Sequence, residues 1–205
     1  MGAALTRRWF DRPSVTVAPA LIGRHLVRRF PDGSRARVRI VETEAYRSDD
    51  PASHSFRGPT ARNLTMFGPA GHLYVYLIYG MHHCMNIVTG GPDRASAVLL
   101  RAAEPLENVP ALQANRGVMD ERALCRGPGR LAQALGVDRT LDGIDLLTSD
   151  VLWIEPGTAV PRAQLDVTPR VGISVATDRP WRWLEAGSRW TTTPTPRRAQ
   201  APGRR

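Results

Sequence analysis

The sequence predicts a single α+β domain: an antiparallel or mixed β-sheet with short helices around it and one protruding β-hairpin. Three observations support this fold class. The chain has 205 residues, the length of one domain. Short runs with strand-like alternation are bounded by turn residues, and short helical runs are scattered among them. No segment of the sequence repeats, so a repeat architecture is excluded.

The first predicted elements are a helix and a hairpin. Residues 14–23 carry apolar side chains at helical spacing and end in a glycine, which predicts a short helix. Residues 25–30 and 37–46 alternate as strands. The segment Pro31-Asp32-Gly33 between them is typical of a tight turn, so the two strands form a hairpin.

A second hairpin follows a long loop. Residues 47–71 are rich in Gly, Pro, Ser and Asn, which predicts a loop with at most one helical turn. Residues 73–88 predict a hairpin that reverses near Tyr79 and Gly80. A three-residue hairpin loop places Asn86 on the face that carries Tyr76, whereas a two-residue loop places it on the opposite face. The sequence is compatible with both.

The second half of the chain predicts shorter elements. Residues 97–101, 151–154 and 171–175 predict strands, and residues 131–135 predict a helix that ends at a glycine. Residues 104–127 predict irregular or partly helical structure.

The predicted domain has a tail at each end. Residues 1–12 predict an N-terminal arm and residues 13–190 the folded domain. Residues 191–205 contain three prolines, four arginines and no large apolar side chain. They predict a disordered basic tail.

The charge balance points to an anionic partner. The 28 basic and 19 acidic residues give a formal charge of +9. Such a chain favours nucleic acid first and an anionic membrane surface second. All the basic residues are arginine. The absence of lysine excludes a Walker A phosphate loop and any enzyme that uses a lysine nucleophile.

The uncharged segment 63–92 raises the question of a membrane span. Glycine, proline, histidine and asparagine interrupt it, and its unbroken apolar run, residues 73–78, is far shorter than the roughly 20 residues that a spanning helix needs. We therefore expect a cytoplasmic protein that associates with the nucleoid through DNA. Cys84 and Cys125 belong to no CxxC motif, so we expect two free thiols.

Two other patterns have more than one interpretation. The side chains of His72, His82, His83 and Cys84 are of metal-ligating types, but adjacent residues of a strand point to opposite sides, so we expect no metal site. The segment Gly127-Pro128-Gly129 is either an ordinary helix start or a site where backbone amides hold a phosphate.

Two carboxylates and an aromatic ring share one face of the strand at 37–46. Because side chains alternate along a strand, Glu42, Glu44 and Tyr46 point the same way. One interpretation is a solvated face with a tyrosine at its rim. The other is a general base beside an aromatic wall.

The tyrosines favour the second interpretation. All four, Tyr46, Tyr74, Tyr76 and Tyr79, lie within one stretch of the chain. Cross-strand packing explains Tyr74 or Tyr76. It does not explain Tyr79, because a large ring at a hairpin reversal is expected to be exposed. Such a ring on a basic protein is suited to entering a DNA duplex, and aromatic walls with a carboxylate suit an enzyme that acts on an extruded base.

Taken together, the motifs resemble the alkyladenine (3-methyladenine) DNA glycosylase family, the type without a helix-hairpin-helix. The resemblance runs in order over about residues 14–185. It rests on VETEAY at 41–46, ASHS at 52–55, MF at 66–67, LYVYLIYGM at 73–81, CMN at 84–86, VLLR at 98–101 with EP at 104–105, and GP at 127–128.

The resemblance implies roles for individual residues in the excision of a purine. Glu44 matches the carboxylate that activates water, and Arg101 matches a residue that helps to place the water or a nearby phosphate. Only this match separates Glu44 from Glu42. Tyr46, His54 and Tyr76 match the walls that stack against the flipped base.

Two further residues match positions that contact the DNA. Tyr79 matches the side chain that enters the duplex in place of the flipped base. Asn86 matches the pocket residue that disfavours the exocyclic amine of guanine. The resemblance assigns no role to His82.

The expected function is therefore base-excision repair. The enzyme would flip damaged purines such as 3-methyladenine and hypoxanthine out of double-stranded DNA and hydrolyse the N-glycosidic bond. We expect a monomer that uses no cofactor and no metal, has no lyase activity and does not bind membranes. The alternatives are a non-catalytic sensor of damaged or distorted DNA and a metal-dependent hydrolase built on the histidines.

Overall fold

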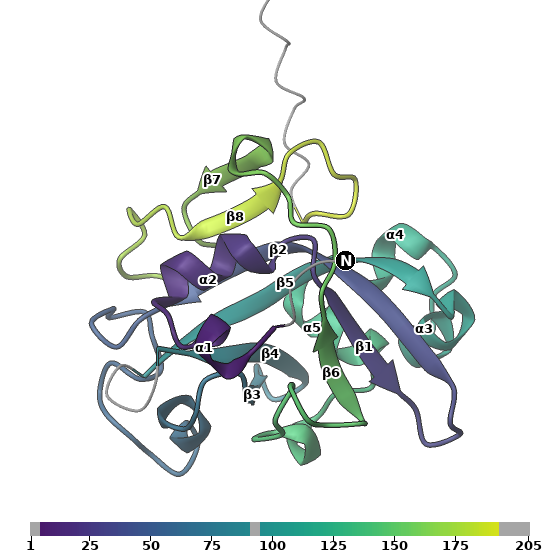
Figure 1. The fold of residues 1–205 in the computed structure, drawn as a ribbon, viewed down its shortest axis with the longest axis horizontal. Coiled ribbons are helices and arrows are strands. Elements are labelled where there is room, and N and C mark those ends of the chain that lie inside the picture. Colours follow the sequence, from purple (N-terminus) through teal and green to yellow (C-terminus); the bar gives the residue numbers. More distant parts are fainter. Residues whose placement is uncertain (1–4, 91–94, 193–205) are drawn as a thin grey trace, which may run out of the picture.

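One curled antiparallel sheet organises the chain (Figure 1). The computed structural model describes residues 5–90 and 95–192. Within them the sheet has the strand order β3-β4-β5-β2-β1-β6, and β8 pairs with both β2 and β7. Its strands are β1 (His25–Arg29), β2 (Arg35–Tyr46), β3 (Leu73–Ile78), β4 (His82–Thr89), β5 (Ser96–Glu107), β6 (Leu152–Glu155), β7 (Leu165–Thr168) and β8 (Arg182–Glu185). The predicted α+β class is confirmed.

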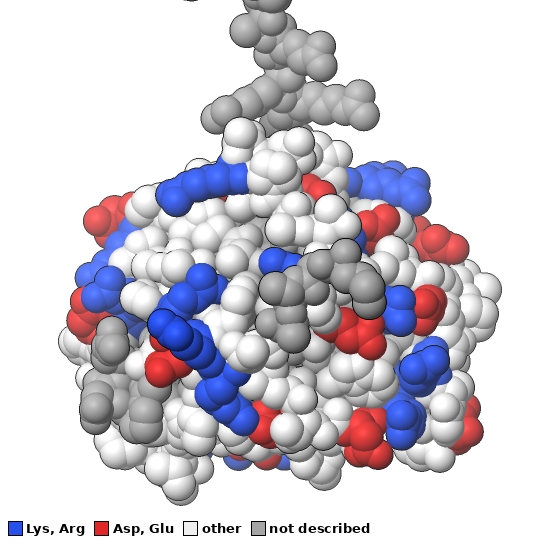
Figure 2. All heavy atoms as spheres, in the orientation of Figure 1, with Lys and Arg blue, Asp and Glu red and all other residues white. Residues whose placement is uncertain are grey.

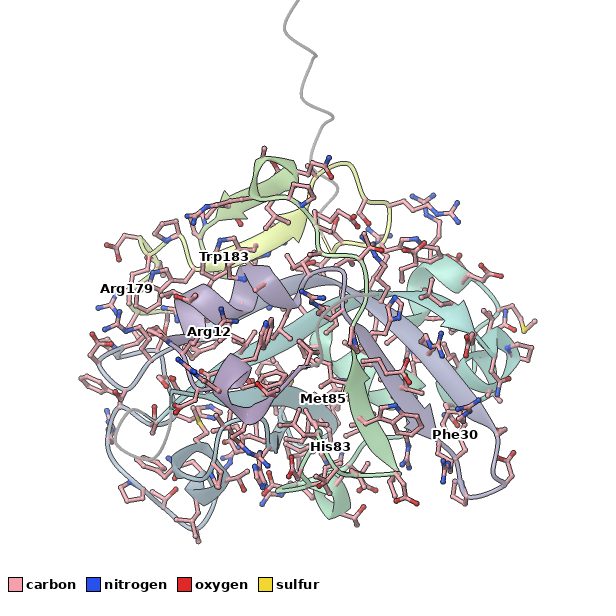
Figure 3. All side chains as sticks on the ribbon, in the orientation of Figure 1. Arg12, Phe30, His83, Met85, Arg179 and Trp183 are labelled. Carbon is pink, nitrogen blue, oxygen red and sulfur yellow. The ribbon has the colours of Figure 1, made fainter. Side chains whose placement is uncertain are left out.

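Short helices surround the sheet. They are α1 (Arg7–Phe10), α2 (Ser14–Leu21), α3 (Val109–Arg116), α4 (Glu121–Leu124) and α5 (Pro128–Ala134), with 3-10 turns η1 (Leu64–Phe67), η3 (Arg139–Leu141) and η4 (Arg162–Gln164). Helix α2 crosses the sheet over β2 and β5, and Trp183 of β8 lies next to it (Figures 1 and 3). Helices α3, α4 and α5 pack together, and α5 lies against β4 and β5.

The core fills the space between the sheet and these helices. Phe10, Leu21, Leu100 and Leu131 come from four different elements and are all fully buried in one cluster. Burial of a side chain of this size contributes about 1.5–3 kcal/mol. Within the predicted N-terminal arm, Phe10 is buried in this core and Leu5 and Trp9 pack against it.

The predicted and observed elements differ most in the second half. Strand β5 continues to Glu107, well past the predicted end at 101. Strands β7 and β8 were not predicted, and the predicted strand at 171–175 is wrong. That segment is a loop in which Gly172 and Ala176 have positive φ angles, of 79° and 50°. Its alternating apolar side chains resemble a strand, but Val171 and Val175 are about half exposed.

The hairpin of β3 and β4 has a three-residue loop. Ile78 pairs with His82, so the loop is Tyr79-Gly80-Met81. This register places Asn86 opposite Tyr74 on the face that also carries Tyr76. Tyr79 has a φ of 53°, which is uncommon for a residue other than glycine, and 80% of its surface is exposed.

Basic and acidic side chains are interspersed on the face shown in Figure 2. In the described part of the chain, no helix is long and apolar enough to cross a membrane. The body of the protein extends through Thr192, since Thr191 is buried and Thr192 donates hydrogen bonds to Glu42. These two residues belong to the predicted tail, and the rest of that tail, residues 193–205, lies outside the described residues.

Candidate active site

A cavity of about 390 Å³ opens on the side of the sheet that carries Tyr76. The register aligns one row of residues across four strands, from Glu44 through Leu99 and Asn86 to Tyr74. The cavity lining comes from β2, β3, β4, β5, the loop between β3 and β4, η1 and the loop before it, the start of α5 and the loop after β7. It comprises Tyr46, Ala52, His54, Arg62, Met66, Tyr74, Tyr76, Ile78, Tyr79, His82, Cys84, Asn86, Leu99, Arg101, Pro128, Gly129, Val171, Gly172 and Ile173.

Glu44 is fully buried, and three residues that line the cavity hold its carboxylate. The hydroxyl of Tyr46 donates to Oε2 at 2.9 Å. The amide of Val171 donates to Oε1 at 2.8 Å, and Arg101 Nη1 lies 3.2 Å from the same oxygen. A carboxylate held by fixed donors has one orientation and does not swing away from a substrate. The donor Val171 therefore belongs to the loop that was wrongly predicted to be a strand at 171–175.

Glu42 is also fully buried, but its partners differ. Its Oε1 accepts hydrogen bonds from Arg101 Nε at 2.9 Å, Arg182 Nε at 2.8 Å and the Thr192 hydroxyl at 2.8 Å. Its Oε2 accepts from the Thr192 amide at 2.7 Å. Burial alone would raise the pKa of Glu42, but the Thr192 amide and the two guanidinium groups outweigh burial and hold that pKa below its usual value.

A double irregularity in the sheet places Arg101 between the two carboxylates. Glu42 pairs with Ala102, but Thr43 pairs with Leu100, so Arg101 is an extra residue of β5 at this point. Such bulges often re-aim a side chain next to an active site. Here the guanidinium of Arg101 reaches Glu42 through Nε and Glu44 through Nη1.

The aromatic wall predicted from the tyrosines is present. The rings of His54 and Tyr76 meet edge to face with centroids 4.5 Å apart, and Tyr74 lies 5.7 Å from Tyr76. His54 Nδ1 and the Tyr74 hydroxyl form a hydrogen bond of 3.0 Å. Burial and the charge of Arg62 lower the pKa of His54, so the ring is neutral at neutral pH.

Arg170 packs against one face of the Tyr46 ring and holds the ring in place. The guanidinium of Arg170 lies 4.7 Å from the ring centroid of Tyr46, and it forms a buried ion pair with Asp50. Burial and the neighbouring Glu44 raise the pKa of Tyr46 well above its usual range, so its hydroxyl keeps its proton and remains a donor.

Asn86 and Tyr79 lie at opposite ends of the part of the cavity lining that the hairpin of β3 and β4 supplies. Asn86 is buried at the cavity floor, and its Nδ2 donates to the Tyr74 carbonyl at 3.2 Å. Tyr79 stands at the cavity mouth on the hairpin tip. Beside it, His82 packs over Gly129, where an added Cβ would lie 3.1 Å from the Cβ of His82.

The structure brings together every residue that the sequence selected for the site. Sequence reasoning missed Val171, Arg182 and Thr192, which lie 127 to 150 positions from the carboxylates they bind. No local pattern marks them. In the described ranges no three His, Cys, Asp or Glu side chains form a metal-binding group. Cys84 and Cys125 are free, buried thiols.

Comparison with known proteins assigns the family. A sequence profile described as methylpurine-DNA glycosylase matches residues 8–189, nearly the whole domain. The chain belongs to the methylpurine-DNA glycosylase family. This glycosylase is 47% identical over 201 residues to a protein of Burkholderia lata, an alignment that covers 96% of this chain and 95% of that protein.

Two other relatives have a similar degree of identity to this chain and a similar coverage. A Streptomyces avermitilis protein is 48% identical over 98% of this glycosylase and 95% of its own length, and one from Carboxydothermus hydrogenoformans is 43% identical over 92% and 98%. All three relatives carry the name "Putative 3-methyladenine DNA glycosylase". The family resemblance inferred from the motifs is confirmed, and it extends to the N-terminal helix α1, which the motifs did not include.

Proposed function

We propose that this protein excises damaged purines, including 3-methyladenine and hypoxanthine, from double-stranded DNA and leaves an abasic site. Glu44 is the observation that carries the proposal. It is a buried carboxylate whose partners Tyr46, Arg101 and Val171 line a cavity with aromatic walls. The names of the relatives agree with this substrate class.

The flipped base lies between Tyr46 and the wall formed by His54 and Tyr76. His54 and Tyr76 touch each other, so a base has no room between them and stacks on the face that they present together. Arg170 covers one face of Tyr46, which leaves the other face for the base. Stacking contributes about 1–3 kcal/mol per contact, and an alkylated, cationic purine prefers aromatic faces.

Hydrolysis requires one base and no strong acid when the purine is alkylated. Glu44 takes a proton from water, and the water oxygen forms a bond to C1′ of the sugar as the N-glycosidic bond breaks. The bonding electrons leave with the purine, which neutralises its positive charge. The transition state resembles an oxocarbenium ion, and the negative charge of Glu44 stabilises it. A neutral lesion such as hypoxanthine needs protonation of, or hydrogen bonds to, the departing base.

The hairpin holds the DNA open. Extruding a base costs a few kcal/mol, and less at a damaged pair. Tyr79 enters the gap that the base leaves, for which its exposure and its place at the cavity mouth suit it. Asn86 at the cavity floor opposes the exocyclic amine of guanine, so undamaged guanine is excluded.

Release of the free base is the decisive test. The protein is incubated with duplex DNA that contains either hypoxanthine at one position or methylated purines, and released bases are identified by chromatography. We expect free hypoxanthine and 3-methyladenine from the wild type, and no release from Glu44→Gln. Tight binding to lesion DNA without release by the wild type would indicate the non-catalytic sensor instead.

A further inference from the structure

We propose that Glu42 is a positioning residue for base excision: anchored by Thr192 and Arg182, it orients Arg101, which in turn holds the catalytic carboxylate Glu44. This inference rests on the proposed function and adds a second carboxylate and a C-terminal strap, residues 190–192, to the machinery. The positioning role of Glu42 is supported by its hydrogen bonds to Arg101, Arg182 and Thr192 and by its burial.

The first argument is that Glu42 does not face the substrate. Both carboxylates are fully buried, but all three partners of Glu44 line the cavity, whereas Arg182 and Thr192, two of the three partners of Glu42, do not. The two oxygens of Glu42 accept four hydrogen bonds, from Arg101, Arg182 and twice from Thr192. Three of these donors converge on Oε1 and one reaches Oε2, so the orientation of the carboxylate is fixed by protein groups. Glu42 therefore acts through its partners.

The second argument is the geometry of Arg101. The residue sits at a bulge, where the regular pairing of β2 and β5 does not fix its direction. Its Nε is held at 2.9 Å by Glu42, and this bond leaves Nη1 directed at Glu44 Oε1. Without Glu42, the guanidinium would have Glu44 as its one acidic partner among these contacts and would rotate toward it.

The third argument is charge. Glu42, Glu44, Arg101 and Arg182 form a buried group of two negative and two positive charges. A buried pair is costly when one partner is removed, because the charge that stays behind is uncompensated. Neutralising Glu42 leaves one excess positive charge next to Glu44.

The strap is the unexpected part of this network. Thr192 supplies two donors to Glu42, and its hydroxyl accepts a hydrogen bond from Arg182 Nη2 at 3.1 Å. Trp190 and Thr191, the other two residues of the strap, are buried against the domain. Residues near the C-terminal end of the described chain thus complete the support of the active site.

The first experiment compares Glu42→Gln with the wild type in single-turnover excision with enzyme in excess. We expect unchanged affinity for lesion DNA and a maximal rate about 10- to 100-fold lower, because misplacement of a supporting group costs rate and not binding. A purely structural residue would instead lower the fraction of active enzyme and leave the maximal rate of that fraction unchanged.

The second experiment keeps the test valid if Glu42→Gln does not fold. Thr192→Val keeps the shape and the amide donor but loses the hydroxyl, whereas Thr192→Ser keeps both donors. We expect a severalfold loss of maximal rate in Thr192→Val and a wild-type rate in Thr192→Ser. A folded Glu42→Gln with the wild-type rate, or equal rates in the two Thr192 variants, would overturn the proposal. Absence of base release by the wild type would instead count against the proposed function.

Discussion

The hydroxyl group of Tyr46 donates a 2.9 Å hydrogen bond to Glu44 Oε2. One residue therefore lines the cavity and also holds the buried carboxylate behind it. Under the proposed function this arrangement would couple recognition to chemistry, because a base stacked on the Tyr46 ring would lie at a fixed position relative to the group proposed to activate water.

Replacing Glu44 with glutamine should leave lesion binding nearly intact and remove most single-turnover excision. The substitution keeps the size of the side chain but removes the proton acceptor, and a general base contributes about 10²- to 10⁴-fold. Rapid-quench assays of base release give the rate, and fluorescence anisotropy gives the affinity. Glu42→Gln on the same strand face is the comparison, with a smaller expected loss of about 10- to 100-fold, and a larger loss in that variant than in Glu44→Gln would reverse our assignment within the pair.

Replacing Tyr79 with serine should weaken excision from duplex DNA more than from single strands. The ring is 80% exposed on the hairpin tip, so its removal does not disturb the core. In duplex DNA the gap left by the flipped base would stay unfilled, which should cost about 10-fold in rate. Equal losses on both substrates would contradict the role of Tyr79 as a wedge.

Removing residues 193–205 should lower DNA affinity without changing the ranking of lesions. The deleted segment carries four arginines, and groups that bind phosphates position a protein without reading the base. For every phosphate that the tail no longer neutralises, the salt dependence of log K should fall by roughly 0.9. Titrations at several salt concentrations measure this slope, and the cut must follow Thr192 because that residue belongs to the network around Glu42. A changed order of lesion preference would show that the tail reads the base.

The enzyme should stop at the abasic site. Glycosylases that also cleave the strand generally form a Schiff base through an amine, and this chain has no lysine. Incubation with lesion DNA and borohydride should give no covalent complex, and the strand should break only after alkali. A trapped complex that forms at the rate of base release would require the N-terminal amine to act in the site.

Acidification should destabilise the wild type more than a His54→Gln variant. The pKa of His54 is lowered in the folded state by burial and by Arg62, whereas in the unfolded chain it is about 6.5. The unfolded state therefore binds the proton first, and the free energy of unfolding decreases as the pH falls below about 6.5, until the folded-state pKa is passed. Denaturant titrations at pH 7.5 and 5.5 measure the difference. A variant that loses as much stability as the wild type would show that His54 is not the group responsible.

Strand alternation was sufficient to predict the chemical face of β2. Because side chains repeat every two residues, Glu42, Glu44 and Tyr46 were placed together, and the structure shows the two carboxylates sharing Arg101. The role of Glu44 as the base stays a prediction. The hairpin loop length was not predictable, since Tyr79-Gly80 suits both a two-residue and a three-residue reversal.

Other parts of the site lie beyond local sequence reasoning. The bulge at Arg101 comes from the way β5 and β2 adjust to each other, and no residue type in VLLR marks it. Val171 was misassigned because alternating apolar residues have the same pattern in a strand and in this loop, in which Gly172 takes a positive φ. Arg182 and Thr192 reach Glu42 from 140 and 150 positions away, and such contacts depend on the whole topology.

The hydrogen bonds between Glu42 and Thr192 have a consequence for how the protein is made. A ribosome that has added Glu42 must add 150 more residues, and release them from its exit tunnel, before the amide of Thr192 reaches that carboxylate. The sheet strands β1 to β5 emerge much earlier and begin to pair during synthesis. A nascent chain would thus acquire most of its fold, including the hairpin of β3 and β4, before the support of Arg101 is complete. Fragments that stop short of Thr192 would lack this support, and peptide tags fused at the C-terminal side should be joined after that residue.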